Sequence, residues 1–134
     1  MKNNLNYGII GNCRTAALIS ERGNIEWLCF PDFDSPSVFA ALLDRTKGGS
    51  FDVSDRYTVR QTYVPHTNIL QTRFTSDEGI FEVLDYMPCY HSFEKEHYLP
   101  AELYRYIRLI AGTPRFRVHY DPAPNYARLC ITHK

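Results

Sequence analysis

The chain has 134 residues, of which 44% are hydrophobic and 22% charged, and its 15 basic and 15 acidic residues give a formal net charge of zero. This size fits a single domain over residues 1–134, and the composition is that of a folded protein rather than a disordered one. The charge balance argues against nucleic-acid binding, which requires a clear basic excess. No stretch approaches the roughly 18 apolar residues of a membrane helix, and the N-terminus lacks the apolar core of a signal peptide. We therefore expect a cytoplasmic protein without a membrane partner.

The first part of the chain alternates short apolar runs with turn residues. The runs "YGII", "TAALIS" and "IEWLCF" are predicted to form strands, and "ERGN" is typical of the hairpin turn that joins the last two. Strict alternation in the third run places Ile25, Trp27 and Cys29 on one face and Leu28 and Phe30 on the other. At least one of these faces is expected to lie in the core.

A helical pattern follows in "DSPSVFAALLD". It predicts one short helix near residues 36–43, because Asp34 or Ser35 can cap its N-terminus and Pro36 suits the first helical position. A helix of about two turns has to be held in place by packing rather than by its intrinsic propensity.

From residue 51 onward the pattern is that of β-strands. In the run "RFRVHYD", Phe116, Val118 and Tyr120 are expected to point inward, and residues 89–100 are expected to form a long loop. The sequence therefore predicts a mainly β fold, an antiparallel β-sandwich with one short helix. The predicted strands in this part are residues 57–64, 68–76, 80–88, 102–112 and 115–121, and a further strand is expected to begin within residues 126–134.

The segment between the third strand and the predicted helix raises the question of catalysis. Asp32 and Asp34 lie two residues apart, and glycosidases use two carboxylates about 5 to 10 Å apart. Aspartates in a proline-rich turn more often accept hydrogen bonds from backbone amides, so we expect capping for Asp34 and leave Asp32 open. No motif for nucleophilic or phosphate chemistry is present, and no catalytic residue or cofactor is predicted.

A metal site is considered only on the polar loop. Cys89, His91 and His97 could in principle ligate a metal ion, but no second group of ligands occurs elsewhere in the sequence. An ordinary surface loop is the simpler interpretation, and no metal is predicted.

The segment from Tyr7 to Asp44 closely resembles the start of bacterial and archaeal glycoside hydrolase family 15 proteins, the glucoamylase and trehalase-like group. The runs "GNCRTAAL", "GNIEWLCFP" and "FDSPSVFAALLD" carry the resemblance, and "YVPHTNILQTRF", "DYMP" and "RLIAG" extend it along the chain. Asp32 departs from the pattern, since many members carry a basic residue there. In the family the sandwich also continues with further strands beyond "NYARLCITHK".

The resemblance implies that this chain is the N-terminal β-sandwich, here a partial supersandwich, that precedes a helical catalytic barrel. Both catalytic glutamates of the family lie on that barrel, so the chain alone is expected to be inactive. It would support the barrel and shape its active-site side in a glucoamylase- or trehalase-like α-glucoside hydrolase. The alternative is a free-standing carbohydrate-binding or protein-interaction module.

Two kinds of partner are expected, the helical catalytic domain of the same protein and a second copy bound through exposed strand edges. An α-glucoside would be bound only through the catalytic domain. If the module touches sugar itself, Trp27, Asp32 and Phe33 are the candidate residues. The residues expected to fix the corner or contact the barrel are Trp27, Phe30, Pro31, Phe33, Asp34, Ser35 and Pro36.

Overall fold

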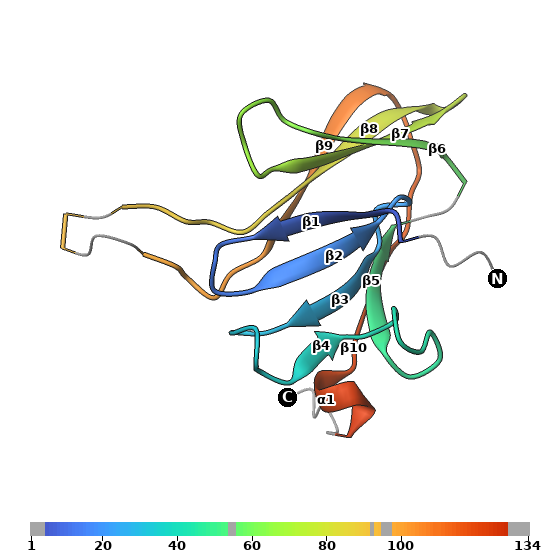
Figure 1. Cartoon of the computed structure of the whole chain (residues 1–134). Helices are drawn as coiled ribbons and strands as arrows, with labels where there is room; N and C mark the ends of the chain where they lie inside the picture. Colours follow the sequence, from blue (N-terminus) through green and yellow to red (C-terminus); the bar gives the residue numbers. More distant parts are fainter. Residues whose placement is uncertain (1–4, 54–55, 92, 95–97, 129–134) are drawn as a thin grey trace, which may run out of the picture.

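Two antiparallel sheets lie one above the other in the computed structural model, which describes residues 5–53, 56–91, 93–94 and 98–128 (Figure 1). Sheet A has the strand order β1-β2-β3-β5-β10, with β4 paired to β3, and sheet B has the order β6-β7-β8-β9. The mainly β, sandwich-like prediction is confirmed. Sheet A contains β1 (Tyr7–Gly11), β2 (Ala16–Ser20), β3 (Ile25–Cys29), β4 (Ser37–Phe39), β5 (Gly49–Val53) and β10 (Val118–Pro122), and sheet B contains β6 (Thr58–Tyr63), β7 (Leu70–Ser76), β8 (Gly79–Tyr86) and β9 (Tyr104–Gly112).

The core lies between the sheets because alternate side chains of each strand point inward. In β7, Leu70, Thr72 and Phe74 are buried, whereas Arg73 between them is exposed. The described core forms two clusters. One gathers around sheet A and contains Ile10, Ala17, Ile19, Ile25, Leu28, Phe39, Leu70 and Met87; the other contains Val53, Tyr57, Phe74, Phe81 and Val83.

A β-bulge changes the faces predicted for β3. Leu18 pairs with Trp27, but the next pair is Ile19 with Ile25, so Glu26 is the extra residue. Ile25 therefore joins Leu28 in the core instead of sharing a face with Trp27, which is only half-buried. The prediction from strict alternation was wrong here, since one extra residue reverses the side on which the following side chains lie.

The helix predicted near residues 36–43 is absent. Ser37–Phe39 is instead strand β4, with Phe39 paired to Leu28 and 3% exposed. The chain then turns back, and the Ala40 N–H donates to the Gly48 carbonyl at 2.8 Å. Burial of Phe39 in the core outweighs the helical propensity of the following alanines and leucines. The one helix among the described residues is α1 (Pro124–Ala127), and its residues 125–127 have positive φ angles.

A buried arginine, paired with an aspartate within sheet B, ties sheet B to sheet A. The side chains of Asp85 in β8 and Arg105 in β9 are 0% and 3% exposed, and both point toward sheet A. Arg105 donates to both Asp85 oxygens, at 2.8 and 3.0 Å, and also to the Phe51 and Gly23 carbonyls at 2.8 and 2.5 Å. The Arg105 guanidinium thus connects β8 and β9 to β5 and to the β2–β3 turn.

The two outer edges of sheet A differ. At β1 the Tyr63 hydroxyl accepts from the Ile9 N–H at 2.9 Å and donates to the Ile9 carbonyl at 2.8 Å, and Asn68 donates to the Gly11 carbonyl at 2.9 Å. These contacts occupy the groups that a further strand would need. At β10, no strand of the described residues pairs with the outer edge.

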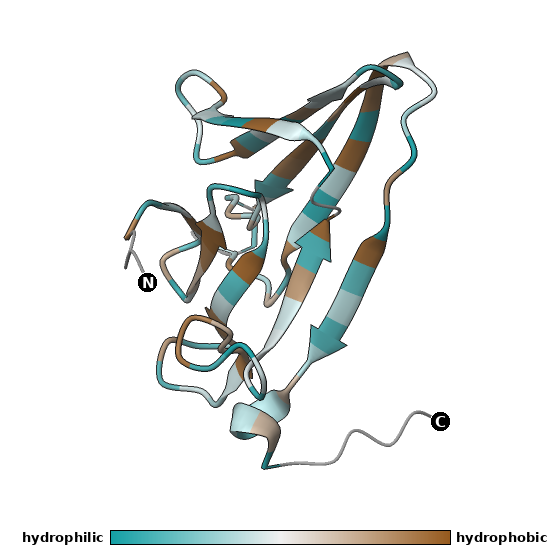
Figure 2. Cartoon of the chain, turned by 90° about the vertical axis from the view of Figure 1, so that its right-hand side faces the viewer, coloured by the Kyte–Doolittle hydropathy of each residue, from teal (hydrophilic) through white to brown (hydrophobic). Residues whose placement is uncertain are grey.

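The side chains predicted to point inward from residues 115–121 remain exposed. Val118 and Tyr120 pair with inward-facing Val53 and Phe51, yet they are 43% and 60% exposed. Phe116 stacks on buried Phe81 at a centroid distance of 4.4 Å and is still 39% exposed. The direction of these side chains was predicted correctly, but their burial was not, because nothing in the described residues covers this side (Figure 2).

Glu82 makes the stability depend on pH. Burial raises the pKa of this carboxyl, but hydrogen bonds from Arg108 and Arg73 outweigh it, so the folded pKa lies below the ordinary value. As pH falls, the unfolded chain binds the proton first, and the stability contributed by the carboxylate is lost as pH passes down through the folded pKa. We expect Glu82→Gln to be less stable at neutral pH but to lose less stability between about pH 5 and pH 3.

Urea unfolding at several pH values measures this difference. Glu78→Gln, at an exposed turn position, is the matched control and should follow the wild-type curve. If the free energy of unfolding falls equally steeply with pH in wild type and in Glu82→Gln below about pH 5, the carboxylate of Glu82 does not cause the acid sensitivity.

Candidate functional site: a three-loop corner

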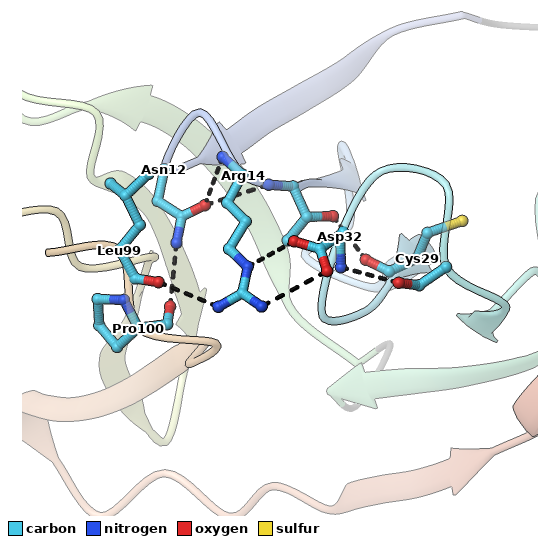
Figure 3. Close-up of polar contacts among 8 residues, drawn as sticks. Asn12, Arg14, Cys29, Asp32, Leu99 and Pro100 are labelled. Carbon is cyan, nitrogen blue, oxygen red and sulfur yellow. Dashed lines mark hydrogen bonds and ion pairs between the residues drawn. The ribbon is translucent and has the colours of Figure 1, made fainter. Parts of the chain in front are cut away.

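Three loops meet at one end of sheet A (Figure 3). They are residues 11–15 between β1 and β2, residues 30–36 between β3 and β4, and residues 99–100 before β9. Asn12, which is 3% exposed, joins the first loop to the third: its side-chain oxygen accepts from the N–H groups of Arg14 and Thr15 at 3.0 and 3.2 Å, and its amide nitrogen donates to the Pro100 carbonyl at 3.0 Å. A single buried amide therefore fixes both the tight turn and the incoming chain.

Arg14 joins all three loops. Its Nε and Nη2 donate to the two Asp32 oxygens at 2.5 and 3.4 Å, and its Nη1 donates to the Leu99 carbonyl at 3.3 Å. The hydrogen bond from Arg14 holds the pKa of Asp32 below its usual range. A carboxylate held in this way is unsuited to act as a general acid near neutral pH, which needs a raised pKa.

The 30–36 loop is folded tightly by its own polar groups. The Asp32 N–H donates to the Ser35 hydroxyl and the Ser35 N–H donates to the Asp32 carbonyl, both at 3.1 Å. The Phe33 N–H donates to the Arg14 carbonyl at 3.1 Å, while the Phe33 side chain is 61% exposed. The corner is thus a braced frame that presents an aromatic ring to the outside.

The structure brings together only part of the predicted set. Asp32, Phe33 and Ser35 lie at the corner, and Pro31, Asp34 and Pro36 are exposed around it. Without a helix at 36–43, the capping role expected for Asp34 or Ser35 is lost. Phe30 packs partly against the core, and Trp27 lies within β3, paired with Leu18 of β2.

Comparison with known proteins assigns the chain to a family. The family model described as "Trehalase-like, N-terminal" matches residues 5–133. The chain belongs to this family. Its relatives include a trehalase of Thermoplasma volcanium, 34% identical over 91% of this chain, and trehalase 2 of Sulfolobus acidocaldarius, 39% identical over 91% of this chain. A trehalase of Mycolicibacterium smegmatis is 34% identical over 94% of this chain. No solved structure matches significantly.

This trehalase-like N-terminal domain spans only about one fifth of the length of those relatives: the matches cover 20%, 21% and 19% of them. No helix among the described residues is long and apolar enough to cross a membrane.

Asn12 and Arg14 are the corner residues that sequence reasoning missed. Both lie in "GNCRT", a run that carried the family resemblance but received no role. A basic residue in the first loop, together with an aspartate in the "PDFD" loop, was the available signal. The partners are 18 residues apart in the sequence for Asp32 and 85 for Leu99, so only the folded domain shows the contact.

Beyond the corner, the described residues 88–91 and 98–101, between β8 and β9, extend past both sheets as an arm (Figure 1). Its two sides are joined by reciprocal backbone hydrogen bonds between Tyr90 and Tyr98, at 3.2 and 2.8 Å. Phe93, which lies between these tyrosines in the sequence, is fully exposed. No group of three potential metal ligands occurs among the residues that the structure describes. Cys89 and His91 lie exposed on the arm, and His97 is outside the described residues.

Proposed function

We propose that this chain is the non-catalytic N-terminal module of a longer glucoamylase- or trehalase-like α-glucoside hydrolase of glycoside hydrolase family 15. The observation that carries this proposal is the extent of the matches. Relatives named trehalase align with the chain over about one fifth of their own length, so most of each relative lies outside the aligned part. In this proposal, the remaining part supplies the catalytic residues and binds the α-glucoside.

The carboxylates of the described residues support a structural role. Three are buried, and each lies against an arginine: Glu26 with Arg45 at 3.3 Å, Glu82 with Arg73 and Arg108, and Asp85 with Arg105. Glu26 also accepts from the Tyr7 hydroxyl at 2.7 Å. Catalysis by a glycosidase needs one carboxyl that keeps a proton near neutral pH and another opposite it. Buried carboxylates that are each paired with an arginine serve folding instead.

The corner and the arm are the surface that we assign to the helical catalytic domain. Arg14 and Asn12 hold the base of the arm, through Leu99 and Pro100, against the same frame that presents Phe33. Exposed aromatic side chains on a pre-organised frame lose little entropy on docking and contribute strongly to interfaces. This arrangement would allow the module to support the catalytic domain and shape its active-site side.

The proposal predicts that the 134-residue chain hydrolyses neither trehalose nor maltose. The expected result is glucose release indistinguishable from that of a buffer blank over a day, measured with a coupled glucose assay. Asp32→Asn serves as the matched variant, because Asp32 is the carboxylate that sequence reasoning left open. Turnover by the wild-type chain that disappears in Asp32→Asn would overturn the non-catalytic assignment.

A second surface, beside β10, is suited to binding another polypeptide. Val118 and Tyr120 point inward from β10 but are exposed, and Leu109 in β9, the register partner of buried Phe81, is 63% exposed. We call these three side chains, with Phe116, the β10 seam. Inward-facing apolar side chains at an unpaired edge favour addition of another strand. We assign that strand to the longer polypeptide, or to a second copy when the chain is alone.

A further inference from the structure

Three tyrosines form a platform on the outer face of sheet B. Tyr86 in β8 and Tyr104 in β9 are register partners whose rings stack at a centroid distance of 5.3 Å and an interplanar angle of 11°. Tyr106 lies two residues farther along β9 and therefore on the same face. Tyr104 and Tyr106 are 45% and 57% exposed, so their rings are available to a ligand. We call Tyr86, Tyr104 and Tyr106 the tyrosine platform.

Charged side chains that can form hydrogen bonds lie at both ends of the platform. At one end the Tyr104 hydroxyl donates to the Glu102 carboxylate at 2.8 Å. At the other end, across Leu84 and Tyr106, Glu82 lies opposite Arg108 and accepts from its guanidinium at 2.5 Å. Glu82 also accepts from Gln71 at 2.9 Å. Arg108 and Glu102, which are both exposed, offer hydrogen-bond donors and acceptors beside the tyrosine rings.

The chemistry of this surface differs from that of the β10 seam. The seam carries side chains that point toward the core, whereas the platform points away from it and keeps charged groups beside its rings. Interface cores between protein domains are depleted of charged residues, so a protein partner fits the platform less well. A neutral ligand with apolar C–H faces and many hydroxyl groups fits it best, because C–H groups are attracted to the negative ring face while hydroxyls bond the flanking charges.

We propose that the tyrosine platform binds a neutral oligosaccharide, with pyranose rings stacked on Tyr104 and Tyr106 and hydroxyl groups bonded by Glu102 and Arg108. That the sugar is made of α-linked glucose units rests on the proposed function. The site adjoins the corner, because the Glu102 N–H donates to the Pro100 carbonyl at 2.9 Å, and it needs no catalytic residue. It would hold a saccharide on the module's own surface.

The position of β9 supports stacking. Within the described residues β9 is the edge strand of sheet B, so no neighbouring strand covers Tyr104 on the side away from Tyr86. A sugar ring on that side would continue the stack that Tyr86 and Tyr104 begin. The stack also orders the Tyr104 ring before binding, which lowers the entropic cost of association.

The test is titration of the 134-residue chain with maltoheptaose, followed by NMR of the tyrosine ring signals. Wild type is expected to bind, with ring shifts confined to the platform. Tyr104→Ala and Tyr106→Ala should each weaken binding about tenfold or more, and Tyr106→Trp should keep or improve it, because a larger ring still stacks. Phe93→Ala removes an exposed aromatic ring outside the platform and should bind as wild type does.

Thermal unfolding of each variant checks that the fold persists, as expected for exposed side chains. No binding by wild type at tens of millimolar sugar, or equal binding by Tyr106→Ala, would overturn the proposal. Loss of association with the hydrolase domain in Tyr106→Ala, without any sugar effect, would show a protein interface instead. The titration measures binding and not turnover. A chain that binds no sugar could still be the N-terminal module of the hydrolase, so the proposed function would stand. Conversely, if the longer protein had a different activity, the measured binding of sugar would still hold.

Discussion

Asp85→Ala is expected to lower the free energy of unfolding by about 3–5 kcal/mol, the usual cost of removing one partner of a buried ion pair. The substitution leaves the Arg105 guanidinium, 3% exposed, without its carboxylate. Arg105 would keep its bonds to the Phe51 and Gly23 carbonyls and its place 4.8 Å from the centre of the Phe51 ring. Two carbonyls and a ring face do not neutralise a buried positive charge.

Urea unfolding followed by circular dichroism measures this effect. Asp34→Ala, an exposed aspartate at the corner, is the matched control and should change stability by about 0.5 kcal/mol or less. The double variant Asp85→Leu with Arg105→Met should recover part of the loss, because an apolar pair of similar volume has no charge to desolvate, whereas the Phe51 and Gly23 carbonyls lose their donor. A single Asp85→Ala variant as stable as the control would show that the buried ion pair does not stabilise the fold.

Self-association of the isolated chain is the second large effect. Light scattering at high concentration should give a mass above that of one chain, because the β10 seam exposes inward-facing side chains beside an edge that no strand of the described residues pairs with. Val118→Lys, which places a charge at a position now 43% exposed, is expected to weaken association about 30-fold or more, equivalent to about 2 kcal/mol.

The opposite edge of sheet A supplies the control. Ile9→Lys adds the same charge to β1 at a side chain that is 53% exposed. The backbone of Ile9 is already bonded to the Tyr63 hydroxyl, so association through this edge is blocked and the variant should behave as wild type. A monomeric wild-type chain at high concentration would contradict the role of the seam, as would equal effects of the two lysines.

Strand content could be predicted because it depends on local alternation. The run "LQTRFTS" repeats apolar and polar residues with a period of two, and it forms β7 with Leu70 and Phe74 inward. The same reasoning failed in β3, where the bulge at Glu26 moves Ile25 to the other face. A bulge is set by the partner strand, and the sequence of one strand alone carries no signal for it.

The sequence predicted only part of the corner, because its bracing contacts also join segments that are distant in the chain. The unusual composition of residues 30–36 marked the corner, and Phe33 is indeed presented there. The arginine that braces it comes from another loop, and the arm that it holds comes from a third. Ion pairs between distant segments form when folding brings the loops together, which local patterns cannot show.

The sequence by itself determined that this chain forms antiparallel strands around an apolar core and that it resembles the N-terminal part of a hydrolase family. Those properties follow from residue period and from motifs that are contiguous in the chain. Only the tertiary structure decided that Ser37–Phe39 is a strand, that Asp32 is held by Arg14, and that Val118 and Tyr120 stay uncovered. Each of these depends on what lies across from the residue in space, since burial and charge pairing are properties of the assembled sheets rather than of any one segment.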